Sequence, residues 1–380
     1  MNTEIIHSQP SWRFASDKVE AAVAQRGGHL APVRFHTENG IIEPYAIAPW
    51  AEEKTPQALP QMLKTLRGDF FCAPFGGNET AYRGESHPPH GESANGAWSF
   101  EALKEDAAAC TLHLSLATRV RAGRVDKFIQ LRKGHTALYC RDILSGMSGK
   151  MDFGHHAILR FPEEPGSGTV STSRILYGQV YPGVFENPEQ GGYSSLKAGA
   201  EFKRLDRVPA AVGGFADVSR YPARRGFEDL LMAVHEARPD FAWTAVTFPR
   251  QRYAWFALKD PRVLRSTVLW LSNGGRHYAP WSGRHTGIMG LEDVTAYFHY
   301  GIAQSARPNP VSKRGFPTSL SLRPAHPLTV NYIMAVAAIP RGFDRVKNIL
   351  PGAGWVELQS AAGPRVRVPL DTAFLQAHGV

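Results

Sequence analysis

The sequence predicts an all-β protein, a large antiparallel β-sandwich with a few short helices. Aromatic and β-branched residues gather in many short apolar runs, as they do in strands. The 36 glycines and 28 prolines lie between these runs, where they favour turns. No alternation of strands and helices that would build a parallel sheet is visible. With 380 residues, 43% of them hydrophobic and 20% charged, the chain can bury a large core, and we expect one domain over residues 1–380 rather than two smaller ones.

The expected elements follow the apolar patterns along the chain. Residues 19–35 alternate around Gly27-Gly28, which predicts two strands joined by a turn. Residues 56–66 (PQALPQMLKTL) predict a short helix, and residues 294–304 predict a second one. The remaining patterns predict strands at residues 111–120, 128–144, 157–161, 172–180, 241–248, 253–258, 266–271, 328–339, 355–358 and 366–370.

Charge and cysteine content argue against several classes of protein. The net charge is +9, but the basic residues are scattered, so we expect no nucleic-acid partner. Cys72, Cys110 and Cys140 are odd in number and lack CxxC spacing, which argues against a disulfide framework and a structural zinc site. The opening MNTEIIHSQPSWRF lacks a signal-peptide pattern, and no apolar stretch long enough to span a membrane follows it. We therefore expect a cytoplasmic protein with no membrane partner.

Histidines in two motifs are the first candidates for proton chemistry. His90 lies in HPPHG, where two prolines stiffen the segment, and an imidazole held in this way can bind a ligand oxygen or move a proton near neutral pH. His155 and His156 precede the apolar run AILRF and therefore begin a strand. Neighbouring strand residues face opposite sides, so one of the two can reach a given pocket, and we select His156. Solvent-exposed side chains without a function are the alternative at both motifs.

A metal site is another use of the same histidines. His87 and His90 are separated by two residues, and a third ligand from His155 or His156 would complete an open zinc or iron site. The paired prolines stiffen this gap, and no HxH or HxxxE pattern accompanies it. We therefore favour a site without metal.

Residues 269–285 (LWLSNGGRHYAPWSGRH) combine aromatic, amide and guanidinium groups. Such groups suit a polyhydroxylated ring, which has apolar CH faces and a rim of hydroxyls. We assign Trp281 to ligand binding and Trp270 to the core. Glu292 and Asp293 precede the second expected helix, and the alternative to catalysis is that they stabilise its N-terminus. An anionic or phosphorylated ligand is also compatible, because four arginines lie near the motifs: Arg67, Arg83, Arg276 and Arg284.

The order of these motifs resembles that of the aldose 1-epimerase, or galactose mutarotase-like, family over most of the chain. GGHL at residues 27–30 is similar to an early hairpin of that family, and Arg67 precedes an HG motif as the family's sugar-binding arginine does. His90-Gly91 with Trp98 resembles the family's HG and Trp segment, and His156 falls where the family has its general-acid histidine. Two later segments also resemble family motifs: GFED at residues 226–229, ending in Asp229, and GLE at residues 290–292, ending in Glu292.

One segment departs from the family pattern. The family's general base is a glutamate in a PGE turn before the last long strand, whereas residues 322–326 read LRPAH in this chain. His326 therefore stands where glutamate is expected. An imidazole, with an unperturbed pKa of roughly 6.5, can still accept a proton from a sugar hydroxyl.

The resemblance implies a galactose mutarotase-like sandwich that interconverts the α and β anomers of an aldose. A base removes the proton of the C1 hydroxyl while an acid protonates the ring oxygen, and the opened ring closes again on its other face. In this scheme His156 is the acid, His326 is the base with Glu292 as its substitute, and the sugar-binding residues are His90, Arg67, Asp229 and Trp281. No metal or organic cofactor is required.

The expected partner is a small sugar, with or without a phosphate group, bound to a monomer or a homodimer. Two other classes of function stay open at this point. One is a carbohydrate-binding or sensing protein that keeps the cleft without turnover, and the other is a metal-dependent enzyme on a β scaffold.

Overall fold

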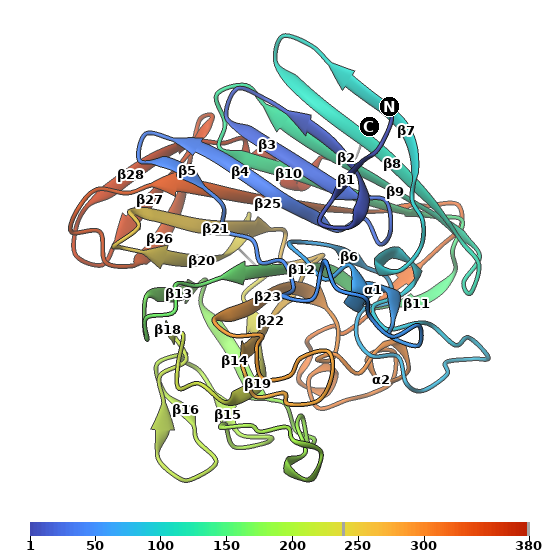
Figure 1. The fold of residues 1–380 in the computed structure, drawn as a ribbon, viewed down its shortest axis with the longest axis vertical. Coiled ribbons are helices and arrows are strands. Elements are labelled where there is room, and N and C mark those ends of the chain that lie inside the picture. Colours follow the sequence, from blue (N-terminus) through green and yellow to red (C-terminus); the bar gives the residue numbers. More distant parts are fainter. Residues whose placement is uncertain (238–239, 378–380) are drawn as a thin grey trace.

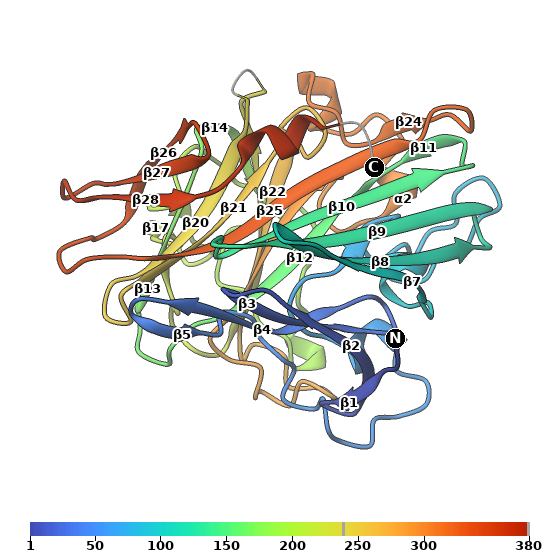
Figure 2. The ribbon, with the colours of Figure 1, turned by 90° about the horizontal axis from the view of Figure 1, so that it is seen from above.

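Two large antiparallel sheets face each other in the structure. The computed structural model describes residues 1–237 and 240–377, and Figures 1 and 2 show it from two directions. Within these residues, nine strands form one large sheet and seven strands form the other. The expected all-β antiparallel sandwich with short helices is therefore confirmed.

The long strands of the nine-stranded sheet lie side by side in Figure 2. In spatial order this sheet contains β18 (Arg220–Tyr221), β13 (Gly168–Thr172), β20 (Ala242–Phe248), β21 (Tyr253–Lys259), β25 (Leu328–Ala338), β10 (Ala137–Ser145), β9 (Gly123–Arg132), β8 (Ala109–Thr118) and β7 (Ser99–Glu105). The seven-stranded sheet contains β15 (Glu201–Phe202), β14 (Ile175–Val180), β19 (Phe227–His235), β22 (Ser266–Asn273), β23 (Ile288–Thr295), β12 (Phe153–Arg160) and β6 (Phe71–Cys72).

Smaller sheets and short helices surround this pair. An N-terminal five-stranded sheet contains β1 (Glu4–Ile6), β2 (Gln9–Ala15), β3 (Val19–Ala24), β4 (Leu30–Thr37) and β5 (Gly40–Ile42). A C-terminal sheet contains β26 (Val346–Gly352), β27 (Trp355–Ser360) and β28 (Arg365–Pro369). Two pairs of short strands are β11 (Gly149–Met151) with β24 (Leu320–Leu322) and β16 (Val208–Pro209) with β17 (Phe215–Ala216). The α-helices of the described residues are α1 (Gln61–Lys64) and α2 (Ile302–Ser305), and the 3₁₀ helices are Glu92–Ala94, Pro188–Gln190, Ser312–Arg314 and Thr372–Gln376.

Apolar side chains cover both faces of the two large sheets over their central strands. Between the sheets, residues such as Trp255 and Leu291 form the main core. The other face of the nine-stranded sheet packs on the C-terminal sheet, for example through Phe256 and Val356. The other face of the seven-stranded sheet is covered by loops and α1, with Val268 among the residues of this second core. Strands buried on both faces read as continuous apolar runs, and for this reason they were recognisable in the sequence.

Most of the predicted strands are present, and three predictions differ from the structure. The helix expected at residues 56–66 is confined to α1. Residues 128–144 form parts of two strands, β9 and β10, because the chain turns at Gly134, which has φ of +78°. The expected helix at residues 294–304 is largely wrong. Residues up to Thr295 belong to β23, which pairs with β12 and β22 and is buried, and only α2 is helical. No helix in the described ranges has the length and hydrophobicity needed to cross a membrane.

Candidate functional site

A cavity of about 330 Å³ lies on the seven-stranded sheet, on the face turned away from the main core. Side chains of β12, β19, β22 and β23 line it, together with the loops that cover this face. Four of the predicted site residues line the cavity: His90, His156, Trp281 and Glu292. Residues distant in sequence thus converge on one concave surface.

Strand pairing places His156 and Glu292 opposite each other. His156 on β12 is the register partner of Glu292 on β23, and its Nε2 lies 3.2 Å from Oε1 of the carboxyl group. Because side chains alternate along a strand, the neighbours His155 and Asp293 point to the main core, where both form buried ion pairs. Gly290 leaves room for the carboxyl group, since a Cβ at this position would lie 2.6 Å from Oε1 of Glu292.

Burial favours the uncharged form of both members of this pair. His156 is 4% exposed and Glu292 is 2% exposed. Burial lowers the pKa of His156 to about 3 and raises the pKa of Glu292 well above its usual value. Burial therefore favours an unprotonated imidazole and a protonated carboxyl group in this pair, which places a proton acceptor beside a proton donor.

Aromatic rings hold the imidazole of His156 in place. Phe70 stacks on it with ring centroids 4.6 Å apart, and Phe70 also stacks on His29 at 4.0 Å. The rings of His90 and Trp270 meet His156 edge-on, at 5.1 and 6.0 Å. These contacts restrict rotation of the imidazole, so Nε2 stays directed towards Glu292.

His90 enters the cavity as a neutral hydrogen-bond donor. Its Nδ1 accepts the backbone N–H of Gly76 at 3.4 Å and lies 3.4 Å from Sγ of Cys72. Because Nδ1 accepts, the ring proton is assigned to Nε2. Burial also holds the pKa of His90 well below its usual value. The side chain can therefore donate an N–H to a ligand oxygen.

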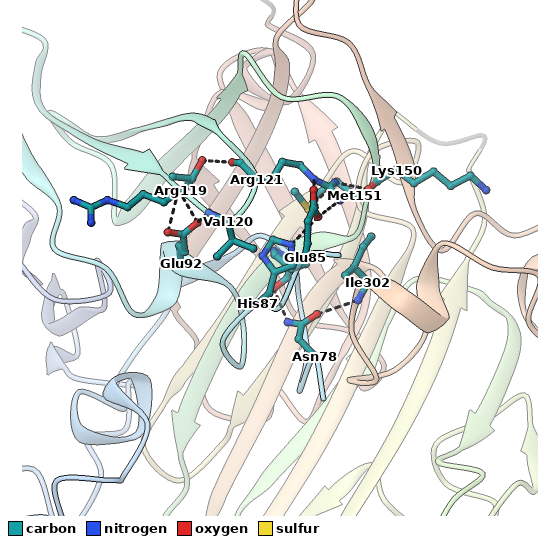
Figure 3. Close-up of polar contacts among 12 residues, drawn as sticks. Asn78, Glu85, His87, Glu92, Arg119, Val120, Arg121, Lys150, Met151 and Ile302 are labelled. Carbon is teal, nitrogen blue, oxygen red and sulfur yellow. Dashed lines mark hydrogen bonds and ion pairs between the residues drawn. The ribbon is translucent and has the colours of Figure 1, made fainter. Parts of the chain in front are cut away.

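Asn78 holds the loop from which His90 projects. His90 has φ of +58°, in the left-handed region that residues other than glycine rarely adopt, so the surrounding contacts must maintain this conformation. Asn78 donates from Nδ2 to the carbonyl of Gly76 at 3.0 Å. Its Oδ1 accepts the N–H of Ile302 at 3.0 Å (Figure 3). The loop is thereby joined to the start of α2.

Two carboxylates fasten the same loop to the turn between β8 and β9 (Figure 3). Glu85 accepts from Nη2 of Arg121 at 2.5 Å and lies 3.0 Å from Nε2 of His87. Glu92 accepts the backbone N–H of Val120 at 2.9 Å. The loop is therefore anchored on both sides of His90 before any ligand binds.

Among the described residues that line the cavity, Arg276 is the one arginine, and there is no lysine. Its Nε donates to Oε1 of Glu186 at 2.6 Å and lies 4.0 Å from Oε2 of Glu228. Although burial acts in the opposite direction, Glu228 and Glu186 raise the pKa of Arg276. The guanidinium carbon lies 4.6 Å from the ring centroid of Trp281, which in turn contacts Trp50 edge-on at 4.8 Å.

Trp270, Glu228 and His299 were not predicted as residues of the site. Trp270, expected in the core, is buried and also lines the cavity, and its Nε1 donates to Oε2 of Glu228 at 3.0 Å. Burial raises the pKa of Glu228 to about 7 and lowers the pKa of His299, a further lining residue, to about 4. The signal for Glu228 lies in the alternation of β19, because the cavity-lining Leu230 is two residues away.

Arg67 does not line the cavity, contrary to the expectation of a sugar-binding role. Its guanidinium is buried and donates to backbone carbonyls of Ile6 at 3.0 Å, His7 at 2.9 Å and Thr65 at 3.2 Å. Burial lowers its pKa to about 10. These contacts fix the N-terminal segment, and they engage the groups that would otherwise bind a ligand.

Asp229 and His326 also lie outside the cavity. Asp229 points to the opposite face of β19 from Glu228 and accepts from the N–H and Oγ of Ser195, at 2.9 and 2.6 Å. His326 is exposed in the turn between β24 and β25, where its N–H donates to the carbonyl of Arg323 at 2.9 Å. Of the two proposed bases, the structure thus places Glu292, and not His326, beside His156.

The histidines of the metal alternative are not grouped as ligands. His87 contacts Glu85, and His155 points away from the cavity that contains His90 and His156. In the part of the chain that the structure describes, no three His, Cys, Asp or Glu side chains are arranged to hold a metal ion.

A larger cavity of about 620 Å³ contains none of the predicted residues. Its charged lining residues carry both signs and include Asp217 and Asp344. Both carboxylates accept hydrogen bonds from serine hydroxyls at 2.5 Å, Asp217 from Ser219 and Asp344 from Ser360. These groups stabilise local turns, so the smaller cavity with the His156 and Glu292 pair is the better candidate site.

Comparison with known proteins identifies the fold. The sequence matches no family model and no curated protein sequence. Among solved structures it resembles a galactose mutarotase-like protein from Clostridium acetobutylicum, with 12% identity and a TM-score of 0.58 over 89% of this chain and 98% of that chain. A galactose mutarotase related enzyme from Lactobacillus acidophilus matches with 13% identity and a TM-score of 0.53 over 87% and 99%. A candidate aldose 1-epimerase from Escherichia coli K12 matches with 13% identity and a TM-score of 0.57 over 87% and 100%.

Proposed function

The chain has the galactose mutarotase-like fold, as the order of its motifs predicted, and from this fold and its cavity we propose that it interconverts the α and β anomers of an aldose. The observation that carries the proposal is the buried pair of His156 and Glu292, whose nearest atoms are 3.2 Å apart and whose burial favours the unprotonated imidazole and the protonated carboxyl group. The two atoms that exchange protons, the C1 hydroxyl oxygen and the ring oxygen, are both bonded to C1. A proton donor and a proton acceptor that lie close together can therefore reach both oxygens at the same time.

In the proposed reaction His156 accepts the proton of the C1 hydroxyl while Glu292 donates its proton to the ring oxygen. The bond between C1 and the ring oxygen breaks, its electron pair goes to that oxygen, and C1 becomes the carbonyl carbon of the open chain. After rotation about the bond between C1 and C2, the reverse transfers close the ring as the other anomer and restore both side chains. The acid role thus moves from His156 to Glu292, because burial favours the protonated carboxyl group.

The other lining residues supply binding contacts in this scheme. His90 donates its Nε2–H to a sugar hydroxyl, and the indole rings of Trp270 and Trp281 offer apolar faces to the CH groups of the ring. The reaction as written needs no metal or organic cofactor. A sugar-binding protein without turnover would use the same contacts and remains the competing proposal.

Polarimetry on freshly dissolved α-D-glucose and α-D-galactose tests the activity. We expect optical rotation to reach equilibrium faster with the protein than in buffer, since each proton transfer contributes on the order of a hundredfold to ten-thousandfold. Calorimetric binding of these sugars without acceleration would instead support the sugar-binding protein. If the protein neither binds these sugars nor accelerates the change in optical rotation, both proposals are rejected.

A further inference from the structure

One wall of the cavity consists of apolar side chains. This apolar wall is formed by α1 and its flanking residues: Pro60, Met62, Leu63 and Leu66. The backbone of the wall is held in place, because the carbonyl of Leu63 accepts Nε1–H of Trp50 at 2.8 Å. The N–H of Met62 donates to Oδ1 of Asn95 at 2.9 Å. The wall is therefore part of the fixed shape of the site.

The polar groups of the cavity come from other elements. His156 and Glu292 lie on β12 and β23, and Arg276 and Tyr278 lie in the segment after β22. The four side chains of the apolar wall carry no N–H or O–H group. A ligand hydroxyl placed against them would lose its hydrogen bonds to water without a replacement, which disfavours binding.

The charge of the cavity does not favour a phosphate group. Arg276 already faces two carboxyl groups, those of Glu186 at 2.6 Å and Glu228 at 4.0 Å. The hydroxyl of Tyr278 donates to Glu186 at 3.2 Å. A phosphate brought to this guanidinium would approach both acidic groups, and among the described lining residues no second cation offsets them.

From these observations we infer that the substrate is a neutral aldose with an apolar group at the apolar wall, such as the methyl group of a 6-deoxyhexose in place of a hydroxyl or a phosphate. This inference rests on the proposed function, since it takes C1 to lie at His156 and Glu292. The pair and the apolar wall line the same cavity, and the inferred placement puts C1 at the pair and the C6 group at the wall.

Three sugars that differ at C6 alone test the inference: D-glucose, 6-deoxy-D-glucose and D-glucose 6-phosphate. Binding is followed by calorimetry and by tryptophan fluorescence, because Trp270 and Trp281 line the cavity. We expect 6-deoxy-D-glucose to bind about tenfold more tightly than D-glucose, the usual discrimination by an apolar pocket, and the phosphate to bind most weakly. Equal binding of the three, tighter binding of the phosphate, or no binding would overturn the inference.

A matched pair of variants locates the preference. Leu63→Asn places an amide on the apolar wall and should remove most of the preference for 6-deoxy-D-glucose, whereas Leu63→Met should keep it. Leu350→Asn changes an exposed leucine of β26, outside the cavity, and should leave the preference unchanged. A preference that survives Leu63→Asn would overturn the assignment of the apolar wall.

Polarimetry of the same three sugars separates this inference from the proposed function. Acceleration of all three sugars without preference would reject the inference and support the activity. Preferential binding of 6-deoxy-D-glucose without acceleration of any sugar would reject turnover and support the ligand class.

Discussion

The site depends on which of two neighbouring strand residues faces the cavity. Alternation limited the choice to one of His155 and His156, and the selected His156, to which the family resemblance also points, lines the cavity. At the other strand the resemblance selected Asp229, whereas Glu228 lies on the side of the cavity. The sequence could not decide between such neighbours, because the seven-stranded sheet is buried on both faces and its polar residues interrupt the apolar pattern of either face.

Replacement of Glu292 tests the assignment of the acid. Glu292→Gln keeps the size of the side chain and its contact with His156 but removes the carboxyl proton. We expect kcat/KM for anomer interconversion to fall by about a hundredfold to ten-thousandfold while the affinity for the sugar changes little. The readout is polarimetry combined with calorimetry. Glu101→Gln, at an exposed glutamate of β7, is the control, and a Glu292→Gln protein within about twofold of the parent would contradict the assignment.

At the scale of elements, the strands were predictable and the loops that complete the site were not. Most strands show apolar runs, because their residues are buried by the two large sheets. The positions of Arg67 and His326 depend on loop conformations that have no periodic signal. The order of motifs placed both residues in the site, and the structure places both outside it. Short sequence motifs locate loops along the chain without defining where their side chains point.

The loop that carries His90 provides a prediction at this scale. Asn78→Ala removes the hydrogen bonds to Gly76 and Ile302 and places alanine at φ of +55°. We expect a loss of about 1–3 kcal/mol in the free energy of unfolding and weaker sugar binding, because His90 is no longer held at the cavity. Urea denaturation and calorimetry measure the two effects. Asn348→Ala, at an exposed asparagine of β26, should change neither quantity, and an Asn78→Ala protein with unchanged stability would show that this contact does not hold the loop.

At the scale of the whole molecule, charged groups lie inside the core between the two large sheets. Nζ of Lys127 lies 2.8 Å from Asp142, which is also 3.4 Å from Nε2 of His155, and both charged side chains are at most 3% exposed. Lys127→Met would leave the carboxylate of Asp142 without its cation, and we expect a loss of about 3–5 kcal/mol in the free energy of unfolding. Urea denaturation measures it, with Arg204→Met at an exposed pair with Asp206 as the control that should change little. If Lys127→Met and the control lose similar amounts of unfolding free energy, the carboxylate of Asp142 does not need this cation in the core.

The titration of buried groups predicts how the stability of the whole molecule depends on pH. Burial lowers the pKa of several histidines: His29, His156 and His285 to about 3, His299 to about 4, and His90 and His235 well below their usual values. Below about pH 6.5 these histidines are protonated in the unfolded chain but stay neutral in the folded chain. The free energy of unfolding therefore falls as the pH is lowered. Burial raises the pKa of four acids: Asp152 to about 8, Glu228 to about 7, Asp229 to about 6, and Glu292 well above its usual value.

Because the folded chain keeps protons on these acids that the unfolded chain releases above roughly pH 4, their burial makes stability fall as the pH rises through about 6 to 8. The effects of the buried histidines and of the buried acids oppose each other, and together they place the maximum of stability at about pH 6.5. Calorimetric unfolding at about pH 5, 6.5 and 8.5 should give the highest midpoint temperature at the middle value. Asp152→Asn removes the carboxyl group with the pKa of about 8 and should reduce the decline on the alkaline side. A midpoint temperature that increases steadily up to pH of about 8.5 would mean that the buried acids are ionised in the folded state, and the proton donor assigned to Glu292 would then be absent at neutral pH.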